Sequence, residues 1–436
     1  MTSPSPTTLG GLVRHLGPGF IITATIVGSG ELIVTPKLGA AVGFSLLWFI
    51  VVGCVLKVFV QIQLARTAVA TGRTTLDELN ALPGPRWRVS WILWLWLAMY
   101  VSLVFQVSGI VGGIAGVFAE LGIGGGPRAW ALPVGVSCAL LLASGRYSVV
   151  ERGSTWMVAL FTLSAVVSVA VLQSTPYRIT GAQVWSGLQF RLPDSFTVAF
   201  AAFGVIGVGA SELIYYPYWC LEKGYARHVG PDDGDAGWAA RARGWMRVMR
   251  VDAGLSLVLY GAITVAFYLL GAAVLHARGL DVTNADMIHV LSQMFRETFG
   301  EWTLVIFLTG AFFVLYSTYF GATAANARLA ADALVLFGVT RYADEAARLR
   351  AVRWFSIGIS LLCALVFLVW SQPVTLVLIG ATGQALMLPF LGVASVRFNR
   401  EIDPRLRGPW WETVGLWLSA AAMVVLGTYQ LWTLAR

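Results

Sequence analysis

The chain has 436 residues, of which 57% are hydrophobic and only 12% are charged, and its mean hydropathy is +0.74. This composition excludes an ordinary water-soluble domain and predicts a polytopic membrane protein. The net charge of +8 would suit a polyanionic partner, but the positions of the basic residues give a simpler explanation below. The four cysteines lie in apolar segments without metal-ligand spacing, so we expect small buried side chains.

Eleven apolar runs are long enough to cross the roughly 30 Å of a bilayer's hydrocarbon core. They predict an all-α protein with eleven transmembrane helices at residues 15–37, 41–65, 91–117, 129–146, 154–173, 196–220, 249–275, 302–335, 352–371, 373–396 and 411–434. The loops between them are too short to form a separate soluble domain. Residues 1–436 are therefore expected to form a single transmembrane domain.

The basic residues are distributed unevenly between the two sets of loops. With a cytoplasmic N-terminus, most of the 30 Lys and Arg residues fall on the cytoplasmic side. The positive-inside rule therefore predicts a multi-pass protein of the plasma or inner membrane, with the N-terminus inside and the C-terminus outside. This asymmetry explains the net charge without nucleic acid as a partner, and we expect a monomer in the lipid bilayer.

One short motif occurs in both the first and the sixth predicted helices. Residues 28–36 read GSGELIVTP, and residues 209–217 read GASELIYYP. A charged side chain within a membrane costs on the order of 3 kcal/mol unless it contacts protein, water or an ion. Glu31 and Glu212 therefore predict a site. Small residues before each Glu and a proline after it are typical of a locally unwound helix, whose free backbone groups can contact a ligand.

The doubled motif also predicts an internal repeat. Helices one to five and six to ten each contain an odd number of spans, so the second half must be inverted relative to the first. We therefore expect a 5+5 inverted repeat with helices 1 and 6 broken. Repeat one covers about residues 15–173, repeat two about 196–396, and one extra helix about 411–434.

Oxygen ligands dominate both copies of the motif, and hard oxygen ligands suit Mg²⁺, Mn²⁺ or Ca²⁺ better than Zn²⁺ or Cu²⁺. We therefore predict a midplane site for a hard divalent cation, which would be the transported substrate and not a cofactor. The predicted binding residues are Glu31, Glu212, Gly28, Ser29, Gly209, Ala210 and Ser211.

Several polar positions have more than one interpretation. Each Glu could instead pair with a neighbour and fix helix packing, with Lys57 and Arg328 as conceivable counter-ions, or one Glu could only carry protons. Gln384 either turns its amide toward the site or packs against the broken helices. Arg328 and Asp332 are spaced i,i+4 and are expected to pair with each other.

Further segments of the sequence resemble the Nramp family of divalent-metal transporters. They include LGPGF at residues 16–20, GFSLLW at 43–48, ATGR at 70–73, RVD at 250–252, ST at 317–318 and LPF at 388–390. The resemblance covers most of the predicted helices. It implies a transporter, not an enzyme, with a LeuT-like fold whose first and sixth helices are broken.

The resemblance also assigns roles to positions at which this chain departs from the family. Gly28 stands where the family has a metal-binding Asp, Glu31 where it has an Asn, and Leu213 where it has a Met. Tyr215 lies near the family's sixth-helix His, and Thr264 near its seventh-helix Asn. These two residues, with Gln384 and Gln106, are the possible accessory residues.

The two acids of the family's proton path correspond to Gln106 and Gly109. The resemblance therefore implies a secondary transporter or uniporter for Mg²⁺ or Mn²⁺ that lacks the usual proton path. The alternative is an H⁺- or Na⁺-coupled transporter of a small organic solute or inorganic anion on the same fold. A third reading is a membrane receptor or scaffold that retains a transporter fold.

Overall fold

A computed structural model describes residues 3–6, 8–144, 159, 162–191, 197–232, 236–300 and 302–434. Within these ranges, nine helices are long and apolar enough to cross a membrane. Two shorter apolar helices, Pro127–Ala143 and Thr162–Leu172, lie at the fourth and fifth predicted spans. The protein is thus an all-helical multi-span membrane protein. Residues 145–158, 160 and 161, which include the end of the fourth predicted span and the start of the fifth, lie outside the described ranges.

In the first half, the long helices lie close to the predicted spans, and short helices occupy the segments between them. The elements are α1 (Leu9–His15), α2 (Pro18–Ile26), the π-helix η1 (Val27–Val34), α3 (Thr35–Val42), α4 (Leu47–Thr71), α5 (Thr75–Asn80), α6 (Trp91–Glu120), α7 (Pro127–Ala143) and α9 (Gly181–Gly187). Between α5 and α6, the strands β1 (Arg86–Trp87) and β2 (Val89–Ser90) form a two-residue antiparallel hairpin. This hairpin is a small addition to the predicted all-α fold.

In the second half, the sixth helix is interrupted between α10 (Thr197–Val205) and α11 (Ala210–Glu222). The further elements of this half are α12 (Tyr225–Val229), α13 (Ala236–Leu270), the π-helix η2 (Gly271–Leu275), α14 (Met287–Phe299), α15 (Thr303–Leu336), α16 (Glu345–Val369), α17 (Pro373–Glu401), the 3₁₀-helix η3 (Pro404–Leu406) and α18 (Trp410–Leu434).

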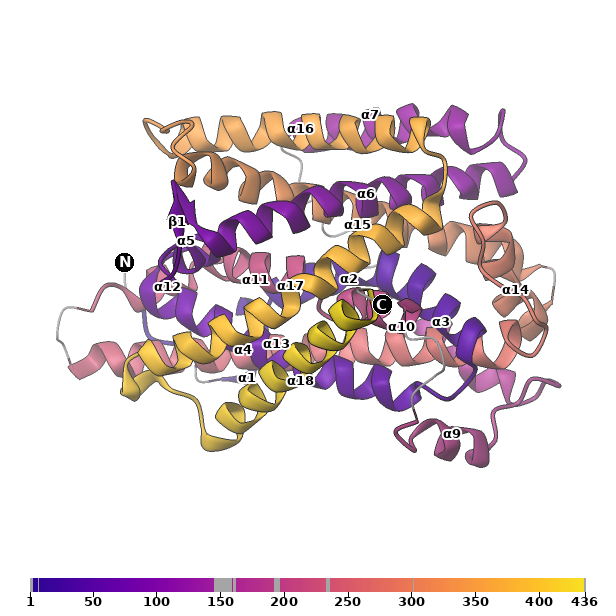
Figure 1. The fold of residues 1–436 in the computed structure, drawn as a ribbon, viewed down its shortest axis with the longest axis horizontal. Coiled ribbons are helices and arrows are strands. Elements are labelled where there is room, and N and C mark those ends of the chain that lie inside the picture. Colours follow the sequence, from indigo (N-terminus) through magenta and orange to yellow (C-terminus); the bar gives the residue numbers. More distant parts are fainter. Residues whose placement is uncertain are drawn as a thin grey trace.

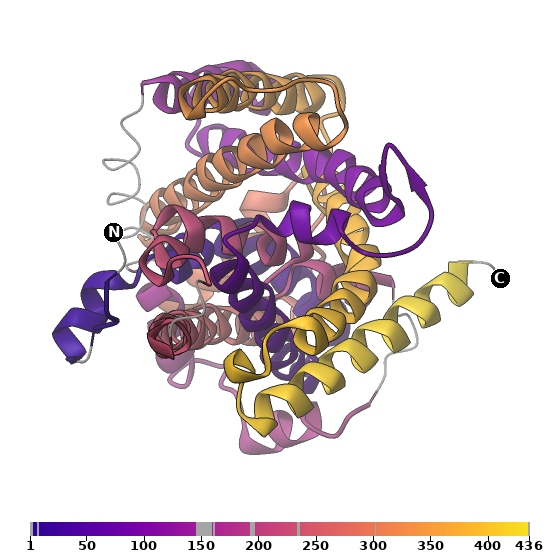
Figure 2. The ribbon, with the colours of Figure 1, turned by 90° about the vertical axis from the view of Figure 1, so that its left-hand side faces the viewer.

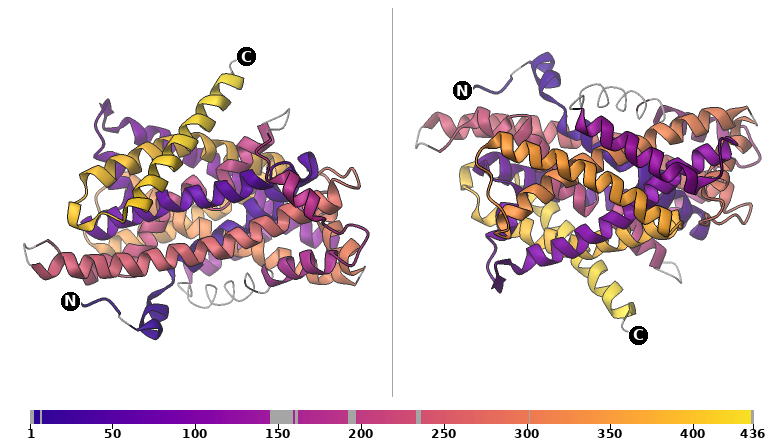
Figure 3. Two further views of the ribbon diagram at one scale, coloured as in Figure 1. Left: turned by 90° about the horizontal axis from the view of Figure 1, so that it is seen from below. Right: turned by 90° about the horizontal axis from the view of Figure 1, so that it is seen from above.

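The long helices run side by side along the longest axis of the molecule (Figure 1) and form a closely packed bundle when viewed from one end (Figure 2). Helix α7 packs on α16 along one edge, α6 packs on α17, and α18 lies against α17 and α4. The last turns of α18 extend away from the bundle (Figure 3). We call the end that carries α1, α5, α12 and the start of α13 the basic end; α9 and α14 lie at the opposite end.

The interruptions of the first and sixth helices differ from each other. Glycine tolerates a positive φ because it has no Cβ, and Gly207 has φ +59° between α10 and α11. The sixth helix is therefore broken at residues 206–209, just before Glu212. The first helix was predicted to unwind in the same way, but it stays helical through Glu31 as η1. A π-helix accommodates the distortion with i→i+5 hydrogen bonds, as between Thr35 N and Gly30 O.

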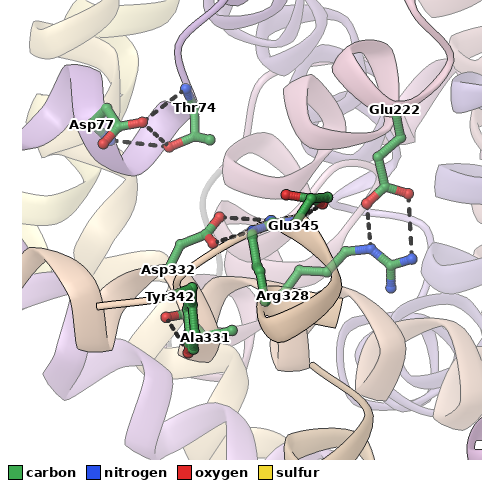
Figure 4. Close-up of polar contacts among 9 residues, drawn as sticks. Thr74, Asp77, Glu222, Arg328, Ala331, Asp332, Tyr342 and Glu345 are labelled. Atoms are coloured by element: carbon green, nitrogen blue, oxygen red, sulfur yellow. Dashed lines mark hydrogen bonds and ion pairs between the residues drawn. The ribbon is translucent and has the colours of Figure 1, made fainter. Parts of the chain in front are cut away.

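Ion pairs join the helices at the basic end. Arg328 on α15 donates to both carboxylate oxygens of Glu222 on α11, at 2.5 and 3.3 Å (Figure 4). Asp332 instead accepts from Arg348 on α16, at 2.7 and 2.9 Å. The predicted pair between Arg328 and Asp332 is therefore wrong. A bidentate contact with another helix is stronger than an i,i+4 contact on one exposed helix face.

A second ion-pair group attaches the last helix to the bundle. Glu412 on α18 accepts from Arg66 on α4 and, at 3.0 Å, from Arg250 on α13. The Arg66 and Glu412 side chains are only 4% and 3% exposed. A buried charge without its partner is strongly destabilising, so this group fixes the first turn of α18 to the bundle.

Candidate functional site

Glu31 lies on η1 and is completely buried. Its Oε1 atom accepts a hydrogen bond from the Gly207 N–H at 3.2 Å and lies 2.8 Å from the Thr264 hydroxyl on α13. Its other carboxylate oxygen, Oε2, is buried and has no hydrogen-bond partner in the described part of the chain. Glu31 thus connects the first helix to the break in the sixth and keeps one oxygen available for a ligand.

Glu212 lies in the first turn of α11 and is also buried. It accepts from the Ser211 hydroxyl at 2.8 Å and from the Tyr215 hydroxyl at 3.0 Å. The Tyr215 oxygen also lies 3.0 Å from the hydroxyl of Thr25 on α2. Glu212 is therefore held by two hydroxyl groups, one of which also contacts the first helix.

The side-chain amides of two glutamines connect the first helix to the sixth helix by hydrogen bonds. Gln106 on α6 donates to Ser29 Oγ on η1 at 3.0 Å, and Gln384 on α17 donates to Gln106 Oε1 at 2.9 Å. Gln384 Oε1 in turn accepts from the Ser211 N–H on α11 at 2.8 Å. Gln106 and Gln384 therefore act together, as a bridge of neutral hydrogen bonds between the two copies of the motif.

The small residues of the motif allow close approach of other helices. A Cβ atom on Gly28 would collide with Thr318 on α15. A Cβ atom on Gly209 would lie 2.5 Å from both Gln384 Oε1 and Glu212 Oε2. Ala210 is fully buried at the start of α11. These positions therefore have a packing role whether or not their carbonyl groups bind a substrate.

The structure brings the predicted residues into one region but gives the two glutamates different partners. No hydrogen-bond partner is shared by Glu31 and Glu212 among the contacts described above. Across the described ranges, no group of three or more His, Cys, Asp or Glu residues is placed to hold a metal ion. A cation here would have to be held by few direct carboxylate ligands, together with hydroxyl, carbonyl or water oxygens.

Sequence reasoning gave Lys57 only a counter-ion role and did not single out Tyr260. Lys57 on α4 is completely buried and donates to the carbonyl oxygens of Phe203 and Ile206, the latter at 2.7 Å. The buried Tyr260 hydroxyl has no partner in the described ranges, and its ring lies against Gly207. A lysine within an apolar run was a visible signal, but its partners lie about 150 residues away and could not be predicted.

Asp252 closes the basic end of the first helix. Its carboxylate accepts from the N–H groups of Gly17 and Gly19, at 3.0 and 2.5 Å, and from the Tyr216 hydroxyl at 2.9 Å. Asp252 is 1% exposed, so these contacts are shielded from water. The carboxylate caps the N-terminus of α2, and it fixes α2 against α11 and α13.

Residues 19–433 match the family described as natural resistance-associated macrophage protein-like, or Nramp. The chain belongs to the Nramp family. It is 26% identical over 306 residues to the divalent metal cation transporter MntH of Mycobacterium tuberculosis, a match that covers 68% of this chain and 64% of that protein. MntH of Bacillus subtilis is 25% identical over 309 residues, with 69% of this chain and 68% of the relative covered.

The fold agrees with solved Nramp structures. A mutant of the manganese transporter of Eremococcus coleocola superposes with a TM-score of 0.69 at 15% identity, over 99% of this chain and 88% of the other. Mhp1, a nucleobase-cation-symport-1 family transporter, superposes with a TM-score of 0.55 at 12% identity, covering 98% of this chain and 95% of Mhp1. The chain thus has the LeuT-like fold implied by the resemblance, and its family is one of transporters and not of enzymes.

Proposed function

We propose that this Nramp protein moves a hard divalent cation, Mg²⁺ or Mn²⁺, across the membrane by alternating access. The observation that carries this proposal is the buried, unpartnered Oε2 atom of Glu31 beside the break in the sixth helix. Buried polar groups are almost always hydrogen-bonded, so a carboxylate oxygen without a partner is suited to a cation. The relatives named MntH are divalent metal cation transporters, which supports the same cargo.

In this proposal Glu31 and Glu212 are the charged ligands. The Tyr260 hydroxyl and carbonyl groups near Gly28, Gly209 and Ala210 supply neutral oxygens. Mg²⁺ retains several of its waters when it binds proteins, so a site with two carboxylates is sufficient. The hydrogen bonds described above for the two Glu side chains come from hydroxyl groups and a backbone N–H, which suits a hard cation, and the Cys54 thiol lies beside Gly207.

Transport would proceed without the proton route of the family. Gln106 and Gly109 stand at the positions of the family's two proton-path acids, and the amides of Gln106 and Gln384 join Ser29 to Ser211 by neutral hydrogen bonds. An amide does not exchange a proton at neutral pH as a carboxylate does, so this row of contacts is structural. We therefore favour uniport of the cation over proton-coupled transport.

The orientation and repeat organisation belong to the same proposal. The basic end would lie in the cytoplasm, because Lys and Arg residues near membrane spans favour that side. Helices one to five and six to ten would form the inverted halves, which meet at η1 and at the break before α11. A monomer would suffice, because the binding residues named above all come from one chain.

The amide bridge also favours the alternative cargo, a small organic solute moved with H⁺ or Na⁺. Amide and hydroxyl groups suit such a solute because they can both donate and accept hydrogen bonds. Proteoliposomes with an internal pH dye distinguish the two cargoes. Proton movement that depends on an added solute would support this alternative and contradict cation uniport.

Titration calorimetry of purified protein with Mg²⁺, Mn²⁺ and Ca²⁺ tests the main proposal. We expect Glu31→Gln to weaken binding by at least tenfold, or about 1.4 kcal/mol, and Glu212→Gln to weaken it as well. Glu120→Gln is the matched control, because Glu120 pairs with His289 at 2.9 Å at the opposite end of the bundle. No divalent-cation binding by the wild-type protein would overturn the proposal.

A further inference from the structure

Lys57 provides a positive charge at the break in the sixth helix. It lies on α4, is completely buried, and donates to the carbonyl oxygens of Phe203 and Ile206. Its ammonium group also lies 4.6 Å from the centre of the Phe203 ring. Within the described ranges, Lys57 forms no ion pair with an Asp or Glu side chain. Its charge is therefore held by backbone oxygens and an aromatic ring.

These two carbonyl groups are among those that the helix break leaves without helical partners. Helix α10 ends at Val205, so Phe203 and Ile206 lie in its last turn and just beyond it. The C-terminal end of a helix carries partial negative charge and attracts cations. Lys57 therefore occupies a place at the break that would otherwise suit a small cation.

The two glutamates lie close enough to interact electrostatically with the Lys57 ammonium. With both carboxylates ionised, the region carries a net charge of −1 when empty and +1 when it holds a divalent cation. Without Lys57, these charges would be −2 and 0. The cost of desolvating a net charge rises with its square, so removing Lys57 would penalise the empty state and favour the loaded one.

We infer that Lys57 is a built-in counter-cation that allows the empty carrier to return across the membrane, so that the protein carries out net uptake and not only exchange. This inference rests on the proposed function, because it requires a divalent cation at Glu31 and Glu212. Alternating access has two reorientation steps, one loaded and one empty. Lys57 affects the rate at which the empty carrier reorients, whereas the two glutamates determine the affinity for the cation.

Proteoliposomes with the membrane potential clamped at zero separate the two steps. Net uptake of radioactive Mn²⁺ into metal-free vesicles requires the empty step, whereas exchange against internal Mn²⁺ does not. For Lys57→Gln we expect the ratio of net uptake to exchange to fall by at least tenfold, with exchange equal to or faster than that of the wild type. Gln can still donate to the carbonyl groups, so this variant removes the charge and not the hydrogen-bonding function.

Two further variants complete the test. Lys57→Arg keeps the charge and should keep the ratio within threefold of the wild type. Lys37→Gln removes a lysine that pairs with Asp281 at 2.7 Å, away from the break, and should also leave the ratio unchanged. If Lys57→Gln proves unstable in detergent, Lys57→Met is reconstituted instead, with the same expected ratio.

Each outcome has a distinct meaning. Wild-type protein that catalyses neither net uptake nor exchange of Mn²⁺ or Mg²⁺ would overturn the proposed function and, with it, the inference. Active wild-type protein with an unchanged ratio in Lys57→Gln would overturn the inference alone. An equal loss of both fluxes in Lys57→Gln would assign Lys57 to folding or binding and would also contradict the inference.

Discussion

Replacing Asp252 should loosen the closed basic end without dismantling the bundle. In Asp252→Asn, the amide oxygen can replace Oδ2, which accepts from Gly19 N and Tyr216 OH, but the amide NH₂ group then meets the Gly17 N–H. One charge-assisted hydrogen bond is lost, and such bonds contribute about 1.5–3 kcal/mol. The other two bonds become neutral and weaken. These changes together should lower the stability of the closed state relative to the open state by about 3 kcal/mol, which raises the population of the open state roughly 100-fold.

The native Cys220 reports this opening. It is fully buried on α11, close to Asp252 and Tyr216. With Cys54, Cys138 and Cys363 replaced by Ala, the rate at which N-ethylmaleimide labels Cys220 follows the population of the open state. We expect labelling to be about 100-fold faster in Asp252→Asn and, with one hydrogen bond lost, about tenfold faster in Tyr216→Phe.

Asp281→Asn is the control for this experiment, because Asp281 pairs with Lys37 away from the basic end. It should leave the labelling rate unchanged. Size-exclusion chromatography checks that each variant is folded. A folded Asp252→Asn protein labelled within threefold of the wild-type rate would refute the reasoning, since the three contacts would then contribute little to closure.

Two other predictions concern the contact between His228 and the N-terminal segment and the hydrogen bonds of Gln384. The His228 Nδ1 atom and the Ser3 hydroxyl form a hydrogen bond of 2.8 Å. Burial, followed by the charges of His15 and Arg227, lowers the pKa of His228 below the ordinary 6.5. Docking of the N-terminal segment should therefore be complete above about pH 6.5 and be lost as the pH falls through the lowered pKa. Hydrogen exchange of residues 3–15, corrected for intrinsic rates, should be faster at pH 5 than at pH 7.5, and equal protection would contradict this. Gln384→Leu should leave Gln106 Oε1 and the Ser211 N–H without partners and lower the free energy of unfolding by about 3 kcal/mol. Equilibrium unfolding in mixed micelles measures this change in free energy, with Thr382→Val as the control on the same helix. If both variants lost the same free energy of unfolding, the hydrogen bonds of Gln384 would not have the predicted stabilising role.

The sequence was sufficient for the fold and for the two central carboxylates. Long apolar runs specify membrane helices because backbone groups must be satisfied within the bilayer, and buried acids such as Glu31 and Glu212 are costly enough to be conspicuous. The Nramp resemblance then supplied the LeuT-like arrangement. The role of these two residues in binding stays a prediction that the calorimetry would test.

The local details depended on tertiary contacts that the sequence does not encode in a simple pattern. Residues 204–209 contain three glycines, and only the packing of Gly207 against Cys54 and Tyr260 is associated with the positive φ. Likewise, the same small residues that predicted unwinding at Glu31 produced the π-helix η1. The Arg328 side chain had two acidic residues within reach, and the position of α11 selected Glu222 over Asp332.

The Arg66, Glu412 and Arg250 group has a consequence for how this chain could change over generations. An ancestor or descendant without α18 would leave the buried Arg66 guanidinium without its carboxylate partner. Loss or gain of α18 therefore requires a compensating substitution at Arg66 in α4, more than 300 residues earlier in the chain. A neutral residue at position 66 should accompany related chains that end before α18, and an Arg should accompany those that retain a Glu in its first turn.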